Sequence, residues 1–336
     1  MKTGLPRIIG SGWAVPKKIR LNNDPIFDWL KANYPNQELF EGYKVRHVLD
    51  EGEDLMTIMV PAAKMALRRA KKKPEDIDLL IGTGSISEYI QPNALSQLHK
   101  ELGLPQRAWA IPVGDDYSNF ASSLLIADGL LRANRAKNIL ICLGGNWSRN
   151  VDYHTLQSIS AADGAGAAVM ALSTDKSKWH VADHCTVMDT RYYGSMYTGG
   201  VPLEAKPPIE GYSNVFSPHF FQITAKGGEG FTKFGTKIAL TSVTKLLKQN
   251  KITAADISFL PHQTSSVLID YWRTHLSPEP AQVLSTLEEF ANVTVATHAL
   301  NLAWFEEKGT IAKNKLVLMA LGPDMHANAI LLQRSS

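Results

Sequence analysis

Short runs of consecutive hydrophobic residues occur at intervals along the chain, separated by longer segments with a different spacing. Residues 7–11 (RIIGS), 78–83 (DLLIGT) and 138–143 (NILICL) are such runs. A short apolar run bounded by polar or turn residues is typical of a strand buried on both faces. We therefore predict β-strands at these three places.

Between the strands, hydrophobic residues recur every three or four positions. Residues 55–72, 93–102 and 119–133 have this spacing, which predicts amphipathic helices. The first helix ends in a cationic turn before Pro74, and the second is followed by Gly103; both are common helix-stop signals. Strands that alternate with helices in this way predict parallel sheets covered by helices on both faces.

The second half of the chain repeats the order of the first. Residues 75–80 (EDIDLL) correspond to residues 255–260 (ADISFL), and residues 136–141 (AKNILI) correspond to residues 313–318 (KNKLVL). Both pairs are separated by about 180 residues, and each member of the second pair leads to a glycine. Self-similarity at a fixed offset indicates a duplicated unit.

We therefore divide the chain into an N-terminal half, residues 1–173, and a C-terminal half, residues 174–336. Residues 188–226 are rich in Gly, Pro, Tyr and Phe and predict an irregular insertion. Its aromatic side chains require burial or a ligand. They are Tyr192, Tyr193, Tyr197, Tyr212, Phe216, Phe220 and Phe221.

Composition narrows the class of protein. The chain has 336 residues, 44% of them hydrophobic and 20% charged, with 35 Lys and Arg against 32 Asp and Glu. These values are ordinary for a globular protein, and a net charge of +3 gives no reason to expect a nucleic-acid partner. The longest apolar runs, such as residues 164–172, are half the length of a membrane helix. We expect a cytoplasmic protein without a membrane anchor.

Three loops at the ends of predicted strands carry the candidate chemistry. They are residues 113–120 (VGDDYSNF), residues 261–264 (PHQT) and residues 292–297 (NVTVAT). In α/β sheets the functional site lies at such strand ends. We therefore expect these three loops to meet.

The segment ADGAGAAV at residues 162–169 stands out beside the PHQ and Asn292 loops. Together these motifs resemble the β-ketoacyl-ACP synthase III family of the thiolase superfamily, over essentially the whole chain. ADGAGAAV is the most specific of them, since the family signature is GDGAGAAV. Residues 261–263 (PHQ) match the catalytic-histidine motif, and Ala291-Asn292 stands where the family has Gly-Asn. The remaining matches are residues 8–12 (IIGSG), Val15-Pro16, residues 45–47 (VRH) and residues 316–332.

The resemblance implies a thiolase-like five-layer αβαβα fold built by internal duplication, and a dimer formed across the central strands. It also implies that the substrate is an acyl or malonyl thioester of CoA or of an acyl carrier protein. No separate cofactor is expected, because the glycines at 10–12 and 82–84 lack dinucleotide spacing. No metal is expected either: His180 and His184 lie on a predicted strand, about 13 Å apart.

The family's nucleophile is the main departure. The resemblance implies a cysteine at the start of the central helix, in a segment like ACxGF, whose thiolate takes the acyl group. Aligned without gaps, Phe120 matches the Phe and Tyr117 occupies the cysteine position. A phenol has a pKa near 10 and stays protonated at neutral pH. Cys142 and Cys185 lie in predicted strands, so we expect packed core thiols rather than substitutes.

The acyl-binding half is altered in a second place. The resemblance implies substrate contacts for Ser118, Phe120 and Gly322, but Ser118 follows the nucleophile position by one residue. On a helical turn its side chain should therefore point about 100° away from the site. Gly322 is followed by Pro323, which has no N–H to donate to an oxyanion. The catalytic pair implied by the resemblance, His262 and Asn292, is retained.

Each of these residues also has a purely structural interpretation. His262 would then be a satisfied core histidine, Asn292 would cap the following segment, and Tyr117 would fill the space of the acyl chain. The position of His262 in a loop after a strand favours a catalytic role for it. For Tyr117, a side chain that fills the acyl-chain space is a better interpretation than a nucleophile.

Our leading functional hypothesis is a divergent 3-oxoacyl-ACP synthase III-like acyltransferase or decarboxylase. His262 and Asn292 would polarise the thioester carbonyl without a cysteine acyl-enzyme, in fatty-acid-like or specialised-metabolite (polyketide) biosynthesis.

Two other hypotheses stay open. In the first, the chain is a catalytically silent subunit that forms a heterodimer with a cysteine-bearing homologue. The weaker possibility is a hydrolase that uses Ser118 with His262 as its base.

Overall fold

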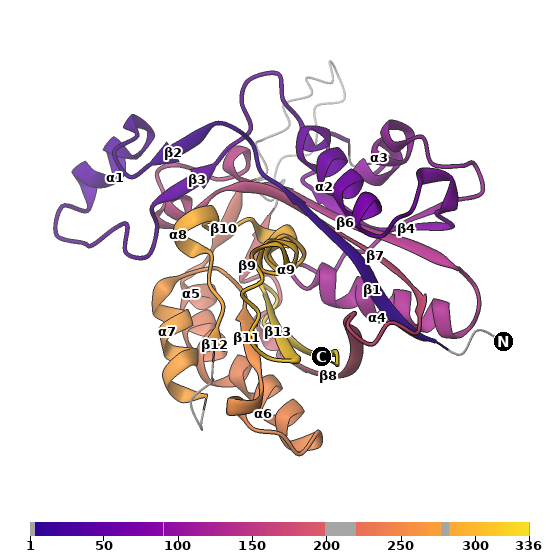
Figure 1. The fold of residues 1–336 in the computed structure, drawn as a ribbon. Coiled ribbons are helices and arrows are strands. Elements are labelled where there is room, and N and C mark those ends of the chain that lie inside the picture. Colours follow the sequence, from indigo (N-terminus) through magenta and orange to yellow (C-terminus); the bar gives the residue numbers. More distant parts are fainter. Residues whose placement is uncertain (1–3, 90, 199–219, 277–281, 336) are drawn as a thin grey trace.

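Two five-stranded sheets form the framework of the computed structural model, which describes residues 4–89, 91–198, 220–276 and 282–335 (Figure 1). The first sheet has the order β1-β7-β6-β4-β5, and the second has the order β12-β11-β13-β14-β8. The strands of the first sheet are β1 (Leu5–Ala14), β4 (Leu79–Ser85), β5 (Trp109–Pro112), β6 (Asn138–Asn146) and β7 (Asp163–Ser173). Those of the second are β8 (His180–Met188), β11 (Ser258–Pro261), β12 (Gln282–Val283), β13 (Lys315–Gly322) and β14 (His326–Gln333).

Two small antiparallel pairs lie outside these sheets, and α-helices cover the faces of the sheets. The pairs are β2 (Ile19–Leu21) with β3 (Val45–His47), and β9 (Met196–Thr198) with β10 (Phe221–Ile223). The helices are α1 (Asp28–Asn33), α2 (Leu55–Arg69), α3 (Ala94–Leu102), α4 (Asn119–Arg132), α5 (Ala225–Lys233), α6 (Ala239–Gln249), α7 (Ser266–His275), α8 (Leu287–Phe290) and α9 (Thr297–Lys308). All strands and helices predicted from the hydrophobic pattern are present, with ends that shift by a few residues.

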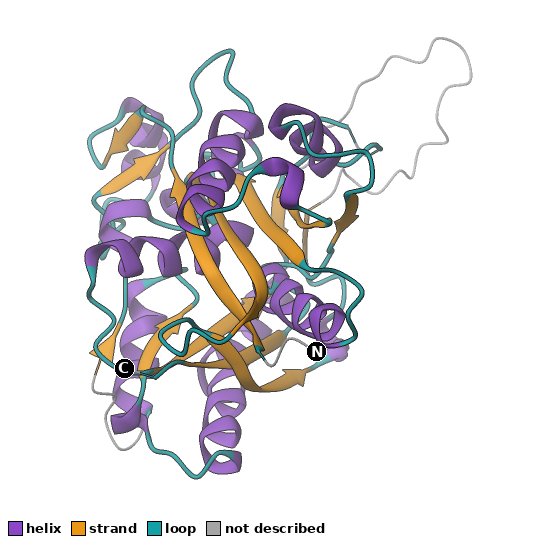
Figure 2. Ribbon diagram, turned by 45° about the vertical axis from the view of Figure 1, so that its right-hand side comes forward, coloured by secondary structure: helices purple, strands orange, loops and turns teal. Residues whose placement is uncertain are grey.

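The helices and sheets stack as five layers, which confirms the predicted thiolase-like fold (Figures 1 and 2). α2 and α3 cover the outer face of the first sheet, and α6 and α7 lie on the far side of the second. α4 and α9 form the middle layer; α4 contacts strands of both sheets. A helix packed on two sides must be apolar all round, and α9 accordingly buries most of its residues.

The prediction that the sheets are parallel was wrong, because each sheet also contains antiparallel pairs of strands. β4 pairs parallel with β5 and β6, and β11 pairs parallel with β12 and β13, but β7, β1, β14 and β8 run antiparallel to their neighbours. Both sheets are therefore mixed. The reason is the connections: only short 3-10 turns join β6 to β7, and a tight turn joins β13 to β14, so neither pair has the crossover helix that parallel pairing requires.

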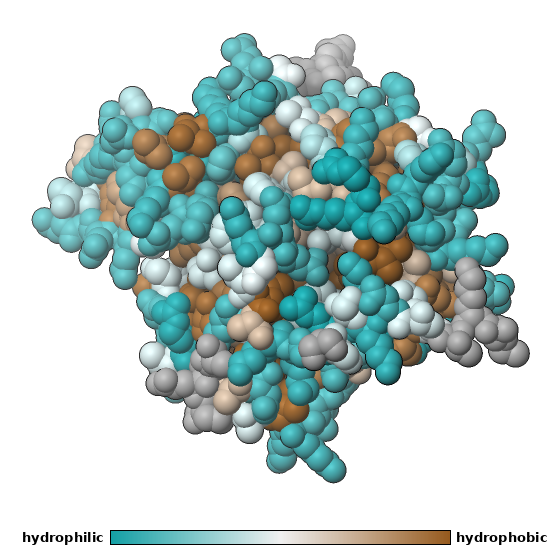
Figure 3. All heavy atoms as spheres, in the orientation of Figure 1, coloured by the Kyte–Doolittle hydropathy of each residue, from teal (hydrophilic) through white to brown (hydrophobic). Residues whose placement is uncertain are grey.

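The same pattern of two parallel and two antiparallel pairings occurs in each sheet, which agrees with the internal duplication. The first sheet ends with β7 at Ser173 and the second begins with β8 at His180. The division of the chain into residues 1–173 and 174–336 stays a prediction. In the part of the chain that the structure describes, no helix has both the length and the apolar character of a membrane span. On the face drawn in Figure 3, hydrophilic residues cover most of the surface and hydrophobic ones form small separate groups.

The glycines of the ADGAGAAV segment have a packing reason. β7 carries this segment, and α9 crosses it at very close range. A Cβ atom at Gly166 would lie 2.1 Å from the Leu300 backbone nitrogen and 2.4 Å from the Ala299 carbonyl carbon. Because both contacts are with backbone, no side-chain rotation can relieve them.

We therefore expect Gly166→Ala to lower the free energy of unfolding by about 3 kcal/mol, since α9 must move away from β7. Gly129→Ala is the matched control, because Gly129 lies in α4 with open space where its Cβ would be. That change should leave stability unchanged or raise it by up to about 1 kcal/mol. Urea denaturation of both variants checks this, and equal stabilities would contradict the packing argument.

Candidate active site

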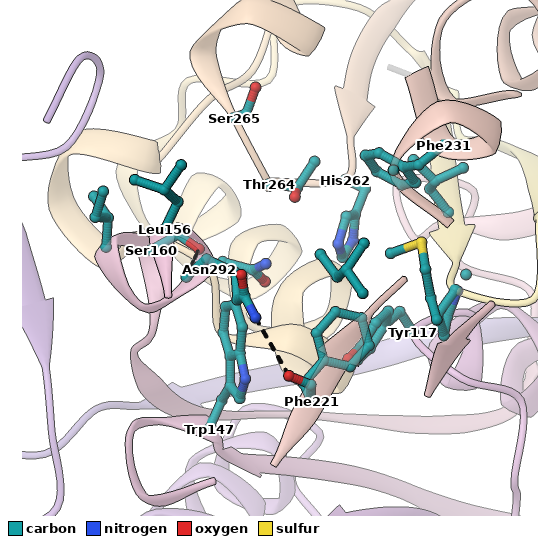
Figure 4. Close-up of a pocket in the computed structure, with 18 of the residues that line it drawn as sticks. Tyr117, Trp147, Leu156, Ser160, Phe221, Phe231, His262, Thr264, Ser265 and Asn292 are labelled. Atoms are coloured by element: carbon teal, nitrogen blue, oxygen red, sulfur yellow. Dashed lines mark hydrogen bonds between the residues drawn. The ribbon is translucent and has the colours of Figure 1, made fainter. Parts of the chain in front are cut away.

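Three segments from different parts of the fold meet at one cavity, as the sequence predicted (Figure 4). Tyr117 comes from the turn before α4, His262 follows β11, and Asn292 follows α8. The cavity has a volume of about 330 Å³. Aromatic and aliphatic side chains form most of its remaining wall; among them are Tyr43, Trp147, Leu156, Ile159, Phe221 and Phe231.

His262 is held at the cavity by its backbone, whose N–H donates to Met319 O in β13 (2.8 Å). Its side chain is only 3% exposed, and its Nδ1 is buried without a hydrogen-bond partner in the described structure. This leaves Nε2 as the nitrogen that can meet a ligand. Burial, together with the charges of His298 and His326, lowers the pKa of His262 to about 3. The imidazole is therefore neutral at pH 7. It can donate or accept a hydrogen bond, but it does not serve as a general acid that carries an extra proton.

Asn292 is fixed on both sides of its backbone. Its N–H donates to Ser160 O (2.9 Å), and its carbonyl accepts from Ala162 N (3.3 Å). The side-chain Oδ1 accepts from Thr294 N (2.9 Å), so the amide NH₂ is the part of the group that remains for a ligand. Ala291 has φ 51°, in the region that favours glycine, where the resembled family has Gly. Ala291 thus adopts a backbone conformation that ordinarily favours glycine.

Tyr117 also has a left-handed backbone conformation, with φ 65°. Its ring stacks on His262, with ring centroids 5.8 Å apart and planes inclined by 20°, and meets Phe221 edge-on at 6.4 Å (Figure 4). Burial, and then the charge of Asp116, raises the pKa of the phenol above its ordinary value. Tyr117 is therefore a neutral group at pH 7 and a poor nucleophile.

A second cavity of about 330 Å³ borders the first. The two share Tyr117, Met196 and Pro323 as lining residues, so the Tyr117 ring forms part of the wall between them. Other residues of the second cavity include Ser85, Asp116, Tyr193, Tyr197 and Asp324. Of the aromatic residues singled out in the insertion, Phe221 lines the first cavity, while Tyr212 and Phe216 lie outside the described residues.

Left-handed backbone at non-glycine residues is concentrated at this site. Besides Tyr117 and Ala291, Thr294 (φ 50°) and Met325 (φ 60°) have positive φ, and they lie next to Asn292 and in the turn after Gly322. Such conformations cost free energy and persist where the surrounding structure imposes them, which is common at functional sites.

Comparison with known proteins agrees with the fold and the motifs. A model of "3-Oxoacyl-[acyl-carrier-protein (ACP)] synthase III" matches residues 116–188, and a model of the C-terminal part of the same enzymes matches residues 247–333. A beta-ketoacyl-[acyl-carrier-protein] synthase III of Rickettsia akari is 26% identical over 320 residues, which cover 94% of each chain. The chain is therefore similar to the 3-oxoacyl-ACP synthase III family over most of its length.

Solved structures agree with the fold. The 3-oxoacyl-[acyl-carrier-protein] synthase III of Aquifex aeolicus superposes with a TM-score of 0.81 at 21% identity, covering 98% of this chain and 99% of that one. The priming β-ketosynthase of the R1128 polyketide biosynthetic pathway superposes with a TM-score of 0.84 at 19% identity, covering 99% and 97%. The assignment of Tyr117 to the cysteine position of this synthase III family stays a prediction.

The three other residues that were predicted to contact the substrate do not all lie at the cavity. Gly322 lines the first cavity, whereas Ser118 and Phe120 are buried in the middle layer and are not among the residues that line it. The hydrogen-bond partner of the Ser118 hydroxyl is His326, whose Nε2 lies 2.7 Å away, and not His262. The hydrolase hypothesis was therefore wrong about its base. Substrate contacts of Ser118 and Phe120 stay predictions.

The two cysteines lie where they were expected. Cys142 is buried in β6, and burial raises the pKa of its thiol far above the ordinary value. Cys185 is half-buried in β8. Neither lines the cavity with His262 and Asn292. Among the described residues there is no group of three or more His, Cys, Asp or Glu placed to hold a metal ion.

Two residues of the motifs found in the sequence hold the walls of the site in place. Asp163, in the ADGAGAAV segment, accepts from Ser148 N (2.8 Å), Ser148 Oγ (2.6 Å) and Leu49 N (2.7 Å). Arg46, in the VRH segment, is fully buried, and its Nε donates to Ile159 O (2.6 Å), next to Ser160 on the cavity wall. Both residues therefore position loops rather than contact a ligand.

Sequence reasoning missed three residues: His298, His326 and Asp324. His298 lies behind His262, with ring centroids 6.1 Å apart, and its Nε2 lies 3.1 Å from Met319 O. Burial lowers the pKa of His298 to about 4. No motif marks any of the three: Asp324 and His326 are two residues apart, but their link to the helix start is through Ser118, 208 residues from His326, and His298 meets His262 only in the folded chain. Only the fold brings them to the site.

The two buried neutral histidines make the protein sensitive to acid. In the unfolded chain a histidine has a pKa near 6.5 and binds a proton more readily than His262 does in the folded protein. The contribution of His262 to the free energy of unfolding is therefore fully present above pH 6.5 and is lost as the pH falls toward 3. Between pH 7.5 and pH 5, His262 should account for a loss of about 2 kcal/mol in the free energy of unfolding.

Urea denaturation at the two pH values should show that His262→Gln loses about 2 kcal/mol less than the wild type. His184→Gln is the control, because His184 is exposed on β8. The same pH dependence in wild type and His262→Gln would contradict a neutral, buried His262.

Proposed function

We propose that this protein binds an acyl or malonyl thioester of CoA or of an acyl carrier protein and polarises its carbonyl with His262 and Asn292. No cysteine acyl-enzyme is formed. The observation that supports this is the pair of hydrogen-bonding groups at one mostly apolar cavity: a neutral imidazole and an amide NH₂, each held by its backbone. Donors fixed before the reaction stabilise an oxyanion best where water is excluded.

With a malonyl thioester, the bond between the α-carbon and the carboxylate breaks and CO₂ leaves. The electron pair moves into the thioester as an enolate, whose oxygen accepts hydrogen bonds from His262 and Asn292, and protonation of the α-carbon gives the acetyl thioester. With an acyl thioester and a separate acceptor, the same two donors would stabilise the tetrahedral oxyanion of direct transfer. Fatty-acid-like or specialised-metabolite biosynthesis is the setting we propose; the polyketide priming synthase of similar fold supports it.

A second function is favoured by the position of Tyr117. Its ring stacks on one face of His262, and Tyr117 lines both cavities, so the ring occupies space beside the histidine that an acyl chain would otherwise use. The chain would then be a catalytically silent subunit that pairs with a cysteine-bearing homologue. Either function allows a dimer through the edge strand β5, where Trp109 is 70% exposed.

To test the leading function, purified wild type and His262→Ala are incubated with malonyl-CoA and the release of CO₂ is measured. Loss of one oxyanion donor should lower the rate by about 10²-fold or more. His184→Ala, an exposed histidine on β8, should keep the wild-type rate. Equal release by wild type and His262→Ala would rule out this role, and restored condensation on co-expression with a cysteine-bearing homologue would favour the silent subunit.

A second variant tests the assignment of the nucleophile position. Tyr117→Cys puts a thiol at the N-terminus of α4 beside His262, where the helix dipole favours a thiolate. Incubation with an acyl-CoA should then give a stoichiometric acyl adduct at residue 117, detected by peptide mass spectrometry. The wild type is the control, because it keeps Cys142 and Cys185. A folded variant that gains no adduct at residue 117 would show that the assignment is wrong.

A further inference from the structure

A serine, a histidine and an aspartate form a continuous hydrogen-bonded chain beneath the first cavity. Ser118 Oγ, at the N-cap of α4, lies 2.7 Å from His326 Nε2 at the start of β14. His326 Nδ1 is hydrogen-bonded to Asp324 Oδ1, in the turn between β13 and β14. Both imidazole nitrogens are therefore occupied. One faces a hydroxyl and the other a carboxylate, which is the arrangement that activates a serine nucleophile.

This chain of groups lies against both cavities. Gly322 lines the first cavity, and a Cβ atom there would lie 2.1 Å from His326 Cε1, so the imidazole packs directly behind the cavity wall. Asp324 lines the second cavity, together with Tyr117 and Asp116. Ser118 itself has no exposed surface, and it follows Tyr117 directly in the turn that leads into α4.

The charges around His326 favour its protonated form. The carboxylates of Asp324, Asp115 and Asp116 face it, and Asp115 Oδ1 lies 3.6 Å from Nε2. Burial lowers the pKa of His326, but the hydrogen bond and charge of Asp324 and the charges of the other two carboxylates outweigh it and raise the pKa above its ordinary value. These carboxylates would therefore stabilise the imidazolium that forms when His326 takes the proton of the Ser118 hydroxyl. The remaining ionisable neighbour, His262, is neutral.

We propose that Ser118 is an acyl acceptor, with His326 as its base and Asp324 holding the imidazole in place. His326 Nε2 takes the proton from Ser118 Oγ while Oγ forms a bond to the thioester carbonyl carbon. The carbon–sulfur bond then breaks, His326 returns the proton to the leaving thiolate, and an acyl ester remains on Ser118. The acyl group reaches Oγ when the Tyr117 ring moves aside, so Tyr117 gates the serine.

The choice of a thioester as the acyl donor rests on the proposed function, but the reactivity of Ser118 does not. A fluorophosphonate needs only an activated serine and releases fluoride when Oγ bonds to phosphorus. It therefore tests the serine independently of any thioester.

Peptide mass spectrometry after fluorophosphonate treatment should find the label on Ser118. Ser118→Ala should abolish it, and His326→Asn should slow labelling by about 10²-fold or more. Ser123→Ala is the matched control, because Ser123 is equally buried on α4 and its Oγ has no partner in the described structure; it should label as the wild type does.

Tyr117→Ala should label at least about tenfold faster. The rate should rise with pH as His326 loses its proton, with a midpoint above pH 6.5 that Asp324→Asn lowers.

Absence of label on Ser118 in both the wild type and Tyr117→Ala would overturn the proposal, as would equal labelling of wild type and His326→Asn. A second measurement uses an acyl-CoA and a rapid acid quench: an ester on Ser118 supports the acyl-acceptor role. Labelling by the fluorophosphonate without any ester from acyl-CoA would overturn that role. Release of CO₂ from malonyl-CoA that depends on His262 would be unaffected by this result, so the two proposals fail separately.

Discussion

The burial of α4 and α9 between two sheets is the constraint on which the site depends. Because both helices are packed on two sides, the positions of their first residues are set by the core rather than by the loops. Ser118 is the N-cap of α4 and Tyr117 directly precedes it, and the segment before α9 carries Asn292. The close approach of α9 to β7 at Gly166 shows how little space this packing leaves. The duplication then supplies the second sheet, in which His262 follows β11 and His326 begins β14, on either side of β13.

Two different electrostatic environments lie close together as a result, since the charge of His326 acts on His262. His262 and His298 are surrounded by apolar side chains and are kept neutral, whereas His326 is surrounded by three carboxylates. Neutral donors suit the stabilisation of an oxyanion without proton transfer, and an imidazole with acidic neighbours suits the acceptance of a proton. The Tyr117 ring stacks on His262, and Tyr117 lines both cavities. A change of one side chain at the helix start therefore affects both regions.

Much of this arrangement follows from the sequence because its signals are local. Strands and helices follow from hydrophobic spacing, and the meeting of the loops at Tyr117, His262 and Asn292 follows from strand ends and from motifs with family-specific spacing. Strand direction does not follow from a hydrophobic run, since parallel and antiparallel buried strands look alike. The link between Ser118 and His326 spans 208 residues and has no spacing rule, so only the tertiary structure reveals it.

The central claim is that a neutral His262, beside the Tyr117 phenol, meets the carbonyl of a bound thioester. Correlation of imidazole ¹⁵N with ring protons by NMR, on histidine-labelled protein at pH 6, tests it most directly. The account predicts that His262, assigned by comparison with His262→Gln, is neutral at this pH and that its ring nitrogen resonance shifts when an acyl-CoA is added. A protonated His262 at pH 6, or no shift at saturating acyl-CoA, would contradict it.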